Sequence, residues 1–301
     1  MKKVYLYAGL AILCWSSVST AFKLSLRYLS PLGLTLFSSV SAMFFLGLVI
    51  LLSPGFSLVR NPRRHFLRNI IRSIPSGILN PFLYYLILFE AYNRLRAQEA
   101  QVLNYTWAIA LSFQAAIILV QKIRYKDIIA LLISFIGVII IATRGRIASL
   151  MFEDLWGTIL AVGSSVIWAT YWLINMKDTR ELKSRLFFNF LAGCFFIGLY
   201  ILVCYFWKGP VSLFVSNQFH LIPVVTGAIY IGIFEMGLTF LLWNKALSSS
   251  DNTSKVANLV FITPFISLIF IAIVLKEPIS AATIAGLILI VISNLYQKTG
   301  S

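Results

Sequence analysis

The amino-acid sequence predicts an all-α integral membrane protein with ten transmembrane helices, arranged as two inverted repeats of five helices each. Three observations lead to this fold class. The 301-residue chain is 59% hydrophobic and only 12% charged, it contains long stretches without Asp, Glu, Lys or Arg, and its two halves match each other segment by segment. Soluble globular proteins are much less apolar, so the expected solvent of this chain is the lipid bilayer.

The apolar stretches have the length of membrane-spanning helices. A helix needs about 20 apolar residues to cross the hydrocarbon core, and a spanning segment must satisfy its own backbone hydrogen bonds. Residues 4–22 follow Lys2 and Lys3 as in a signal peptide, but they take part in the repeat, so we interpret them as the first spanning helix. The other predicted spans are the uncharged stretches 29–59, 73–89, 100–121, 128–143, 155–176, 186–207, 209–234, 256–275 and 278–297.

The positive charge of the chain is explained by membrane topology. The net charge is +15, but the basic residues lie in short loops between apolar segments rather than in a basic domain or tail. With the N-terminus in the cytoplasm, 17 of the 25 Lys and Arg residues fall on the cytoplasmic side, as the positive-inside rule requires. We therefore predict a multi-pass protein of the cell (inner) membrane with both termini in the cytoplasm and no nucleic-acid partner.

An internal repeat relates the two halves of the chain. Ser16-Ser17-Val18 in the first predicted helix matches Ser164-Ser165-Val166 in the sixth, and Gly77-Ile78 in the third matches Gly232-Ile233 in the eighth. Each unit has an odd number of crossings, so the second copy enters the membrane from the opposite side. The predicted repeats are residues 1–147 and 148–301, with a substrate site near the bilayer midplane where the two units meet.

One carboxylate lies in the middle of a predicted span. Glu235 interrupts an otherwise uncharged segment, and the corresponding position in the first repeat is Asn80. An ionisable residue at this depth is costly and is usually functional. Pro81 and Gly237 loosen the helix next to these two residues, and Tyr84 follows Asn80 by one helical turn on the same face. Two roles remain open for Glu235: it neutralises a cationic group of the substrate, or it is a proton-coupling site.

Aromatic and amide side chains form a belt in the first, fourth and sixth predicted helices. Trp and Tyr offer flat apolar faces with a polar edge, which suits amphipathic solutes, and their ring faces attract cations. The alternative for such residues is anchoring at the membrane surface. We predict that the substrate-binding residues are Trp15, Asn80, Tyr84, Asn104, Trp107, Trp168, Tyr171, Glu235 and Asn258. At the membrane surface, we expect Lys23 to extend to the lipid headgroups and Glu99 to lie in a solvated loop.

The pattern resembles a known transporter group. Trp15-Ser16 in the first helix, with Pro264 and Leu275-Lys276-Glu277-Pro278 in the second repeat, resembles the EamA family of the drug/metabolite transporter (DMT) superfamily over essentially the whole chain. Segments 103–107 and 167–171 are similar to those of the YddG-like aromatic amino acid exporters, although Ala108 stands where that group usually has proline. The resemblance implies an alternating-access carrier with the EamA/DMT fold.

The sequence carries no signal of catalysis. His65 and His220 are the only histidines and have no metal-ligand spacing with Cys or carboxylates, and the chain lacks a GKT/GKS phosphate-binding loop. We therefore predict that the protein is not an enzyme and uses neither a metal nor another cofactor.

The predicted function is secondary transport, in the export direction, of small metabolites through a central cavity. Amino acids, including aromatic and hydrophobic ones, are the expected substrates, and the lipid bilayer is the other partner. One alternative is a membrane-embedded enzyme or scaffold whose polar residues serve packing only; another is a carrier of the same superfamily for nucleosides, polyamines or drugs. The sequence leaves the oligomeric state open and is compatible with a monomer.

Overall fold

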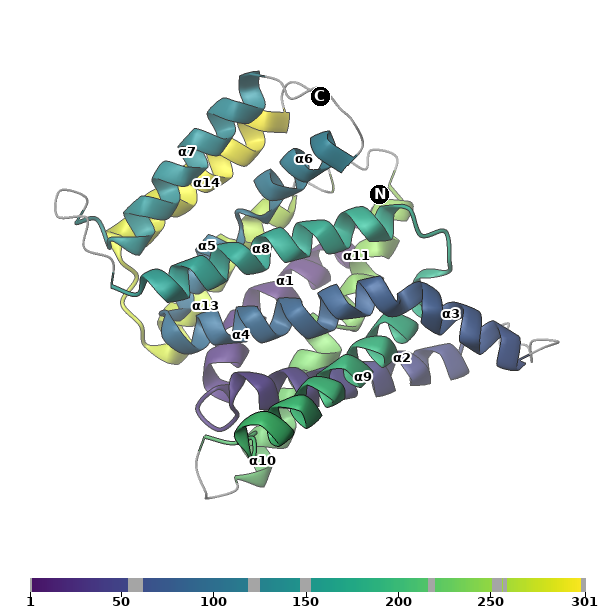
Figure 1. The fold of residues 1–301 in the computed structure, drawn as a ribbon. Helices are drawn as coiled ribbons and strands as arrows, with labels where there is room; N and C mark the ends of the chain where they lie inside the picture. Colours follow the sequence, from purple (N-terminus) through teal and green to yellow (C-terminus); the bar gives the residue numbers. More distant parts are fainter. Residues whose placement is uncertain are drawn as a thin grey trace.

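The computed structural model describes residues 2–53, 62–118, 125–146, 153–215, 220–250, 256 and 259–298. Within these ranges the chain is almost entirely helical, and its only extended pairing is an isolated bridge between Leu29 and Phe214. Figure 1 shows the helices as a bundle, with α7 and α14 paired along one edge. The predicted all-α class is confirmed for the described part of the chain.

The first half of the chain begins with two long helices. Ser30 caps the second of them, since its hydroxyl oxygen accepts a hydrogen bond from the Gly33 amide (3.1 Å), and Pro31 occupies the first turn, where no amide donor is needed. The elements of this half are α1 (Lys2–Ser25), α2 (Pro31–Leu51), α3 (Pro62–Gly77), η1 (Ile78–Leu83), α4 (Tyr84–Arg94), α5 (Ala97–Asn104), α6 (Trp107–Ile118) and α7 (Tyr125–Ala142).

The second half repeats this pattern of long and interrupted helices. Asp154 caps its first helix, because its carboxylate accepts a hydrogen bond from the Gly157 amide (2.7 Å). The elements are α8 (Leu155–Met176), α9 (Leu182–Lys208), α10 (Leu221–Tyr230), η3 (Ile231–Glu235), α11 (Leu238–Ser248), η4 (Leu259–Ile262), α13 (Thr263–Phe270), η5 (Ile271–Leu275) and α14 (Ala281–Lys298).

The structure supports several membrane crossings. Among the described residues, 7 helices are long and apolar enough to span a bilayer, and the apolar segments Leu259–Leu275 and Ala281–Tyr296 are shorter. The predicted span 100–121 is not one continuous helix, because the turn at Tyr105 and Thr106 separates α5 from α6. The protein is therefore a multi-pass membrane protein, and the count of ten crossings stays a prediction.

The helix interruptions predicted at Asn80 and Glu235 are present in the structure. In η1, a π-helical turn, Asn80 is extended (φ −146°, ψ 118°), and Pro81 has no amide hydrogen to donate to the preceding turn. A second π-helical turn, η3, ends at Glu235, and Gly237 follows with non-helical backbone angles (φ −116°, ψ −81°). Turns of this kind inside longer helices are frequently found at functional sites.

Helix contacts occur in matched sets in the two halves. α1 packs against α11 and α13, while α8 packs against α4 and α6; α2 packs on α9, and α7 on α14. Lys23, near the end of α1, and Gly157, near the start of α8, both contact the chain around Leu95 that follows α4. The end of α1 and the start of α8 therefore lie at the same end of the molecule, so the two helices run in opposite directions.

Glycines allow the closest approaches between helix backbones. A Cβ atom at Gly232 would lie 2.5 Å from the Ser38 carbonyl oxygen and 2.8 Å from the Ala42 nitrogen of α2. The repeat partner Gly77 has the same relation to α9, where a Cβ would lie 2.7 Å from the Asn189 carbonyl oxygen. Small residues are the usual means of such contact in membranes. Both π-helical turns are thereby held against a helix of the other half of the chain.

We expect Gly232→Ala to lower the melting temperature of the detergent-solubilised protein. The new methyl group meets backbone atoms of α2, which cannot rotate away, so the cost is about 1–3 kcal/mol, as for other overpacked cores. Gly198→Ala in α9 is the matched control: its Cβ would have no neighbour within 4 Å, so the melting temperature should be unchanged or higher. Equal melting temperatures for the two variants would contradict this account of the packing.

Candidate functional site

A cavity of about 330 Å³ lies in the centre of the bundle, between helices of both halves. This volume falls within the range of small-molecule sites, roughly 300–1,000 Å³. Most of its wall is apolar or aromatic, with a few amide groups and one carboxylate. The lining residues are Trp15, Val18, Phe22, Tyr84, Leu88, Tyr92, Gln101, Asn104, Tyr105, Trp107, Ala108, Leu111, Ser112, Trp168, Trp172, Glu235, Trp243, Leu247, Val260, Phe261 and Asn294.

The cavity extends toward the end of the bundle at which the chain begins. Leu247 lies next to the end of α11, and Val260 lies in η4. Both elements belong to the cluster formed with Val4 and Ala8 at the start of α1. In the opposite direction the cavity ends at Tyr92, close to the end of α4. The cavity therefore extends along much of the bundle, from Tyr92 near the end of α4 to Leu247 near the end of α11.

The structure brings six of the nine predicted site residues together on the cavity wall: Trp15, Tyr84, Asn104, Trp107, Trp168 and Glu235. Asn80 and Tyr171 lie behind the wall. Tyr171 stacks on Trp168 with 5.5 Å between ring centroids. Asn258 lies outside the described residues.

Asn80 does not line the cavity, whereas Tyr84 does. A separation of four residues places two side chains on one face only in a regular α-helix. The π-helical turn and the extended backbone of Asn80 change that phase, so Tyr84 reaches the cavity while Asn80 packs inside the protein with no exposed surface.

Aromatic rings form a continuous wall around the cavity. Trp168 stacks on Tyr84 with 4.6 Å between centroids and meets Trp172 edge-on at 6.1 Å. On the other side, Trp15 lies 5.5 Å from Trp243 and 6.0 Å from Phe240. These pairs fix the rings in place, so the wall offers preformed flat surfaces to a bound solute.

Glu235 is the carboxylate of the cavity wall and is only 7% exposed. Its Oε1 atom accepts a hydrogen bond from the hydroxyl of the fully buried Tyr85 (3.1 Å). Its Oε2 atom is buried and receives no hydrogen bond from the described residues. A buried carboxylate oxygen without a donor is costly, so this atom has unused hydrogen-bonding capacity.

The amide side chains are arranged at two levels of the cavity. The Tyr92 hydroxyl donates to Gln101 Oε1 (2.7 Å) and lies 2.9 Å from the Ser19 hydroxyl oxygen, and these contacts close one end of the cavity. Asn104 donates to Ser164 (2.9 Å) and accepts from Tyr84.

The sequence analysis missed several lining residues, including Gln101, Trp172, Trp243 and Asn294. Gln101 precedes Asn104 by three residues, and Asn294 interrupts an apolar helix, so intramembrane amides at helical spacing were an available signal. Nothing in the sequence distinguishes the two tryptophans from those that face lipid.

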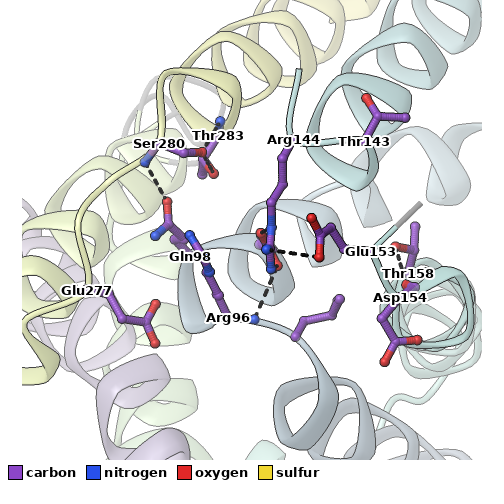
Figure 2. A network of polar contacts seen from close by, with 12 residues as sticks. Arg96, Gln98, Thr143, Arg144, Glu153, Asp154, Thr158, Glu277, Ser280 and Thr283 are labelled. Carbon is purple, nitrogen blue, oxygen red and sulfur yellow. Dashed lines mark hydrogen bonds and ion pairs between the residues drawn. The ribbon is translucent and has the colours of Figure 1, made fainter. Parts of the chain in front are cut away.

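A polar network covers the end of the bundle where α4 turns into α5; we call it the Arg144 network. The buried Glu99 carboxylate accepts from Arg144 Nε (2.6 Å) and from the Arg96 amide (3.2 Å). Arg144 also pairs with Glu153 (3.3 Å). Figure 2 shows this network, in which Gln98 Oε1 also accepts from the Ser280 amide (2.9 Å). Glu99 raises the pKa of the Arg144 guanidinium through their direct hydrogen bond.

Two expectations about this end of the molecule are wrong. Glu99 is 4% exposed rather than solvated, because Arg144 neutralises it. Lys23 does not reach the headgroups: its ammonium donates to the carbonyl oxygens of Tyr92 (2.5 Å) and Leu95 (2.6 Å) at the end of α4. The free carbonyls of a helix C-terminus favour a cation, which explains this position.

Comparison with known proteins identifies the family. The sequence profile of the EamA-like transporter family matches residues 2–143 and, separately, residues 155–296. The chain belongs to the EamA-like transporter family. The sequence assignment to this family is confirmed, whereas the narrower YddG-like group stays a prediction.

Individual relatives cover nearly the whole chain. An uncharacterized transporter of Bacillus subtilis (strain 168), YvbV, is 27% identical over 96% of this chain and 90% of its own length. An uncharacterized transporter of Archaeoglobus fulgidus is 24% identical over 99% of this chain and 98% of its own. A crystal structure with 19% sequence identity matches with a TM-score of 0.61, covering 98% of this chain and 96% of the other, which supports the fold alone.

We expect Glu99→Ala to destabilise the protein by about 1–3 kcal/mol. This is less than the cost of breaking a fully buried pair, because the Arg144 side chain keeps 25% of its surface exposed and is partly screened. Glu90→Ala is the control: Glu90 pairs with Arg94 on the surface, with side chains 32% and 39% exposed, and its loss should cost under about 1 kcal/mol. Thermal unfolding in detergent measures both; equal effects would show that the Glu99 pair adds no stability beyond a surface pair.

Proposed function

We propose that this chain is a secondary carrier that moves a small amphipathic metabolite through the central cavity by alternating access. The observation that carries the proposal is a cavity of about 330 Å³ between the two halves, with Glu235 on its wall at the η3 interruption. In carriers built from repeats, substrate sites lie where the repeats meet and are formed by interrupted helices.

We further propose that residues 1–147 and 148–301 are inverted repeats with ten crossings in all. Three findings support this: the separate family matches to residues 2–143 and 155–296, the matched sets of helix contacts, and the opposite directions of α1 and α8. The contacts of Gly77 and Gly232 are a fourth supporting finding, because in each half they place a π-helical turn against a helix of the other half.

Side-chain contacts join helices at both ends of the cavity. At the α4–α5 end, Lys23 bridges α1 to the end of α4, and the Arg144 network joins α5 to the end of α7. At the opposite end, Arg180, which follows α8, donates to the Asn69 carbonyl oxygen (3.0 Å) and to the Ser73 hydroxyl (2.9 Å) of α3. Alternating access therefore requires the Lys23 and Arg144 contacts to break when the α4–α5 end opens.

The substrate class and direction of transport rest on sequence resemblance. The similarity of segments 103–107 and 167–171 to aromatic amino acid exporters implies export of amino acids across the inner membrane. The aromatic wall supports a solute with an aromatic or hydrophobic side chain. The competing class, a scaffold or enzyme whose polar groups only serve packing, predicts no saturable flux.

We expect Trp107→Ala to reduce counterflow of the transported solute in proteoliposomes at least tenfold. Trp107 lines the cavity, so its loss removes a contact surface for the solute. Trp207→Ala is the control, because this tryptophan is 87% exposed at the end of α9 and faces away from the protein. Radiolabelled amino acids and amines are the test solutes. Saturable flux with equal rates in both variants would exclude this cavity as the pathway.

We expect Glu235→Gln to reduce downhill exchange and gradient-driven accumulation together. The substitution removes the carboxylate charge from the cavity wall, so it weakens binding in either assay. Flux with and without an imposed pH gradient makes the comparison. If the variant loses only the accumulation driven by the pH gradient and keeps downhill exchange, Glu235 is a proton-coupling site and not a binding residue.

A further inference from the structure

Two residues of the cavity wall each carry a buried acceptor atom that no described residue satisfies. Glu235 Oε2 and Asn294 Oδ1 both belong to lining residues, which are 7% and 1% exposed. Asn294 donates one of its two amide hydrogens to the Tyr105 carbonyl oxygen (3.4 Å), and its Oδ1 atom accepts no hydrogen bond from the described residues. Buried polar atoms without partners are rare in folded proteins. The unmet capacity of this cavity is therefore for a hydrogen-bond donor.

The charge of the wall has one sign. The lining residues include one carboxylate and, within the described part of the chain, no Lys, Arg or His. The nearby cation Lys23 is bound to the carbonyl oxygens of Tyr92 and Leu95, and it does not line the cavity. A cationic group entering here would meet an unpaired carboxylate oxygen, whereas an anionic group would meet a like charge in a medium of low dielectric.

The aromatic wall adds to this preference. The rings of Trp15, Trp107, Trp172 and Trp243 line the cavity together with Glu235. Ring faces of tryptophan attract ammonium groups, most strongly where water is excluded. An ammonium group supplies three donors and no acceptor, which matches two free acceptors beside aromatic faces.

We propose that the cavity selects aromatic amines over the corresponding amino acids, with the ammonium group at Glu235 and the aromatic ring against the tryptophan wall. This rests on the proposed function and narrows it, since sequence resemblance alone implies amino acids. The substrate carboxylate is the discriminating group: it has no cationic partner among the described lining residues and lies near the Glu235 charge.

Three ligands that share one ring and chain length test this selection. Phenethylamine carries only the ammonium group, phenylalanine carries both charges, and 3-phenylpropionate carries only the carboxylate. Isothermal titration calorimetry on the detergent-solubilised protein should give the tightest binding for phenethylamine, at least tenfold weaker binding for phenylalanine, and the weakest for 3-phenylpropionate. The proposal is overturned if phenylalanine binds to the unmodified protein as tightly as phenethylamine does. It is also overturned if phenethylamine does not bind.

Variants then assign the selection to Glu235. Glu235→Gln keeps an acceptor for the Tyr85 hydroxyl but removes the charge, so the affinity for phenethylamine should fall at least tenfold. The ratio of the phenethylamine affinity to the phenylalanine affinity should therefore decrease. Glu235→Asp keeps the charge and should retain the preference. Glu90→Gln, which changes a carboxylate of the surface pair with Arg94, should leave the affinities unchanged. An unchanged ratio in folded Glu235→Gln overturns the assignment.

Counterflow in proteoliposomes separates this inference from the proposed function. Saturable counterflow of phenylalanine but not of phenethylamine would keep the carrier and overturn the amine selection. Tight phenethylamine binding without counterflow of any of the three solutes would keep the amine site and overturn the carrier.

Discussion

The hydrocarbon core of a bilayer offers no hydrogen-bonding partner, so each interruption of a spanning helix must be covered by protein or face a cavity. The interruptions in this chain obey that constraint in two different ways. The one at Asn80 is covered, because η1 packs against α9 and leaves Asn80 with no exposed surface. The one at Glu235 lies at the cavity wall. The same type of turn, at Asn80 in the first half and at Glu235 in the second, is thus buried against a helix in one half and contributes to the cavity wall in the other.

The elements that sequence predicts well are those governed by local hydrophobicity. Most of the apolar stretches lie in observed helices, although the stretch 100–121 is divided between α5 and α6. The loosened backbone at Asn80-Pro81 and at Glu235-Met236-Gly237 follows from residue types alone. Six of nine predicted site residues reach the cavity, because aromatic and polar residues are scarce enough inside apolar helices to be recognised.

The elements that sequence fails to predict depend on backbone phase or on distant partners. Tyr84 lines the cavity and Asn80 does not, because Asn80 lies in a π-helical turn with non-helical backbone angles. The pattern of side chains in the sequence does not reveal such a turn. Glu99 is buried because Arg144 reaches it from beyond the end of α7, 45 residues later in the chain. Lys23 likewise depends on a distant partner, because its ammonium group donates to carbonyl oxygens at the end of α4. Such pairings are tertiary, and a single sequence contains no direct record of them.

The pairing of α7 with α14 has a mechanical consequence. Gly137 and Gly286 bring these helices into backbone contact, since a Cβ at Gly137 would lie 3.0 Å from the Gly286 carbonyl oxygen. Arg144 extends from the end of α7 and Ser280 precedes the start of α14, and they bind Glu99 and Gln98, adjacent residues of α5. The pair formed by α7 and α14 therefore contacts α5 at two adjacent residues, Gln98 and Glu99. Moving α5 away from α7 and α14 therefore requires both contacts, Glu99 with Arg144 and Gln98 with Ser280, to break.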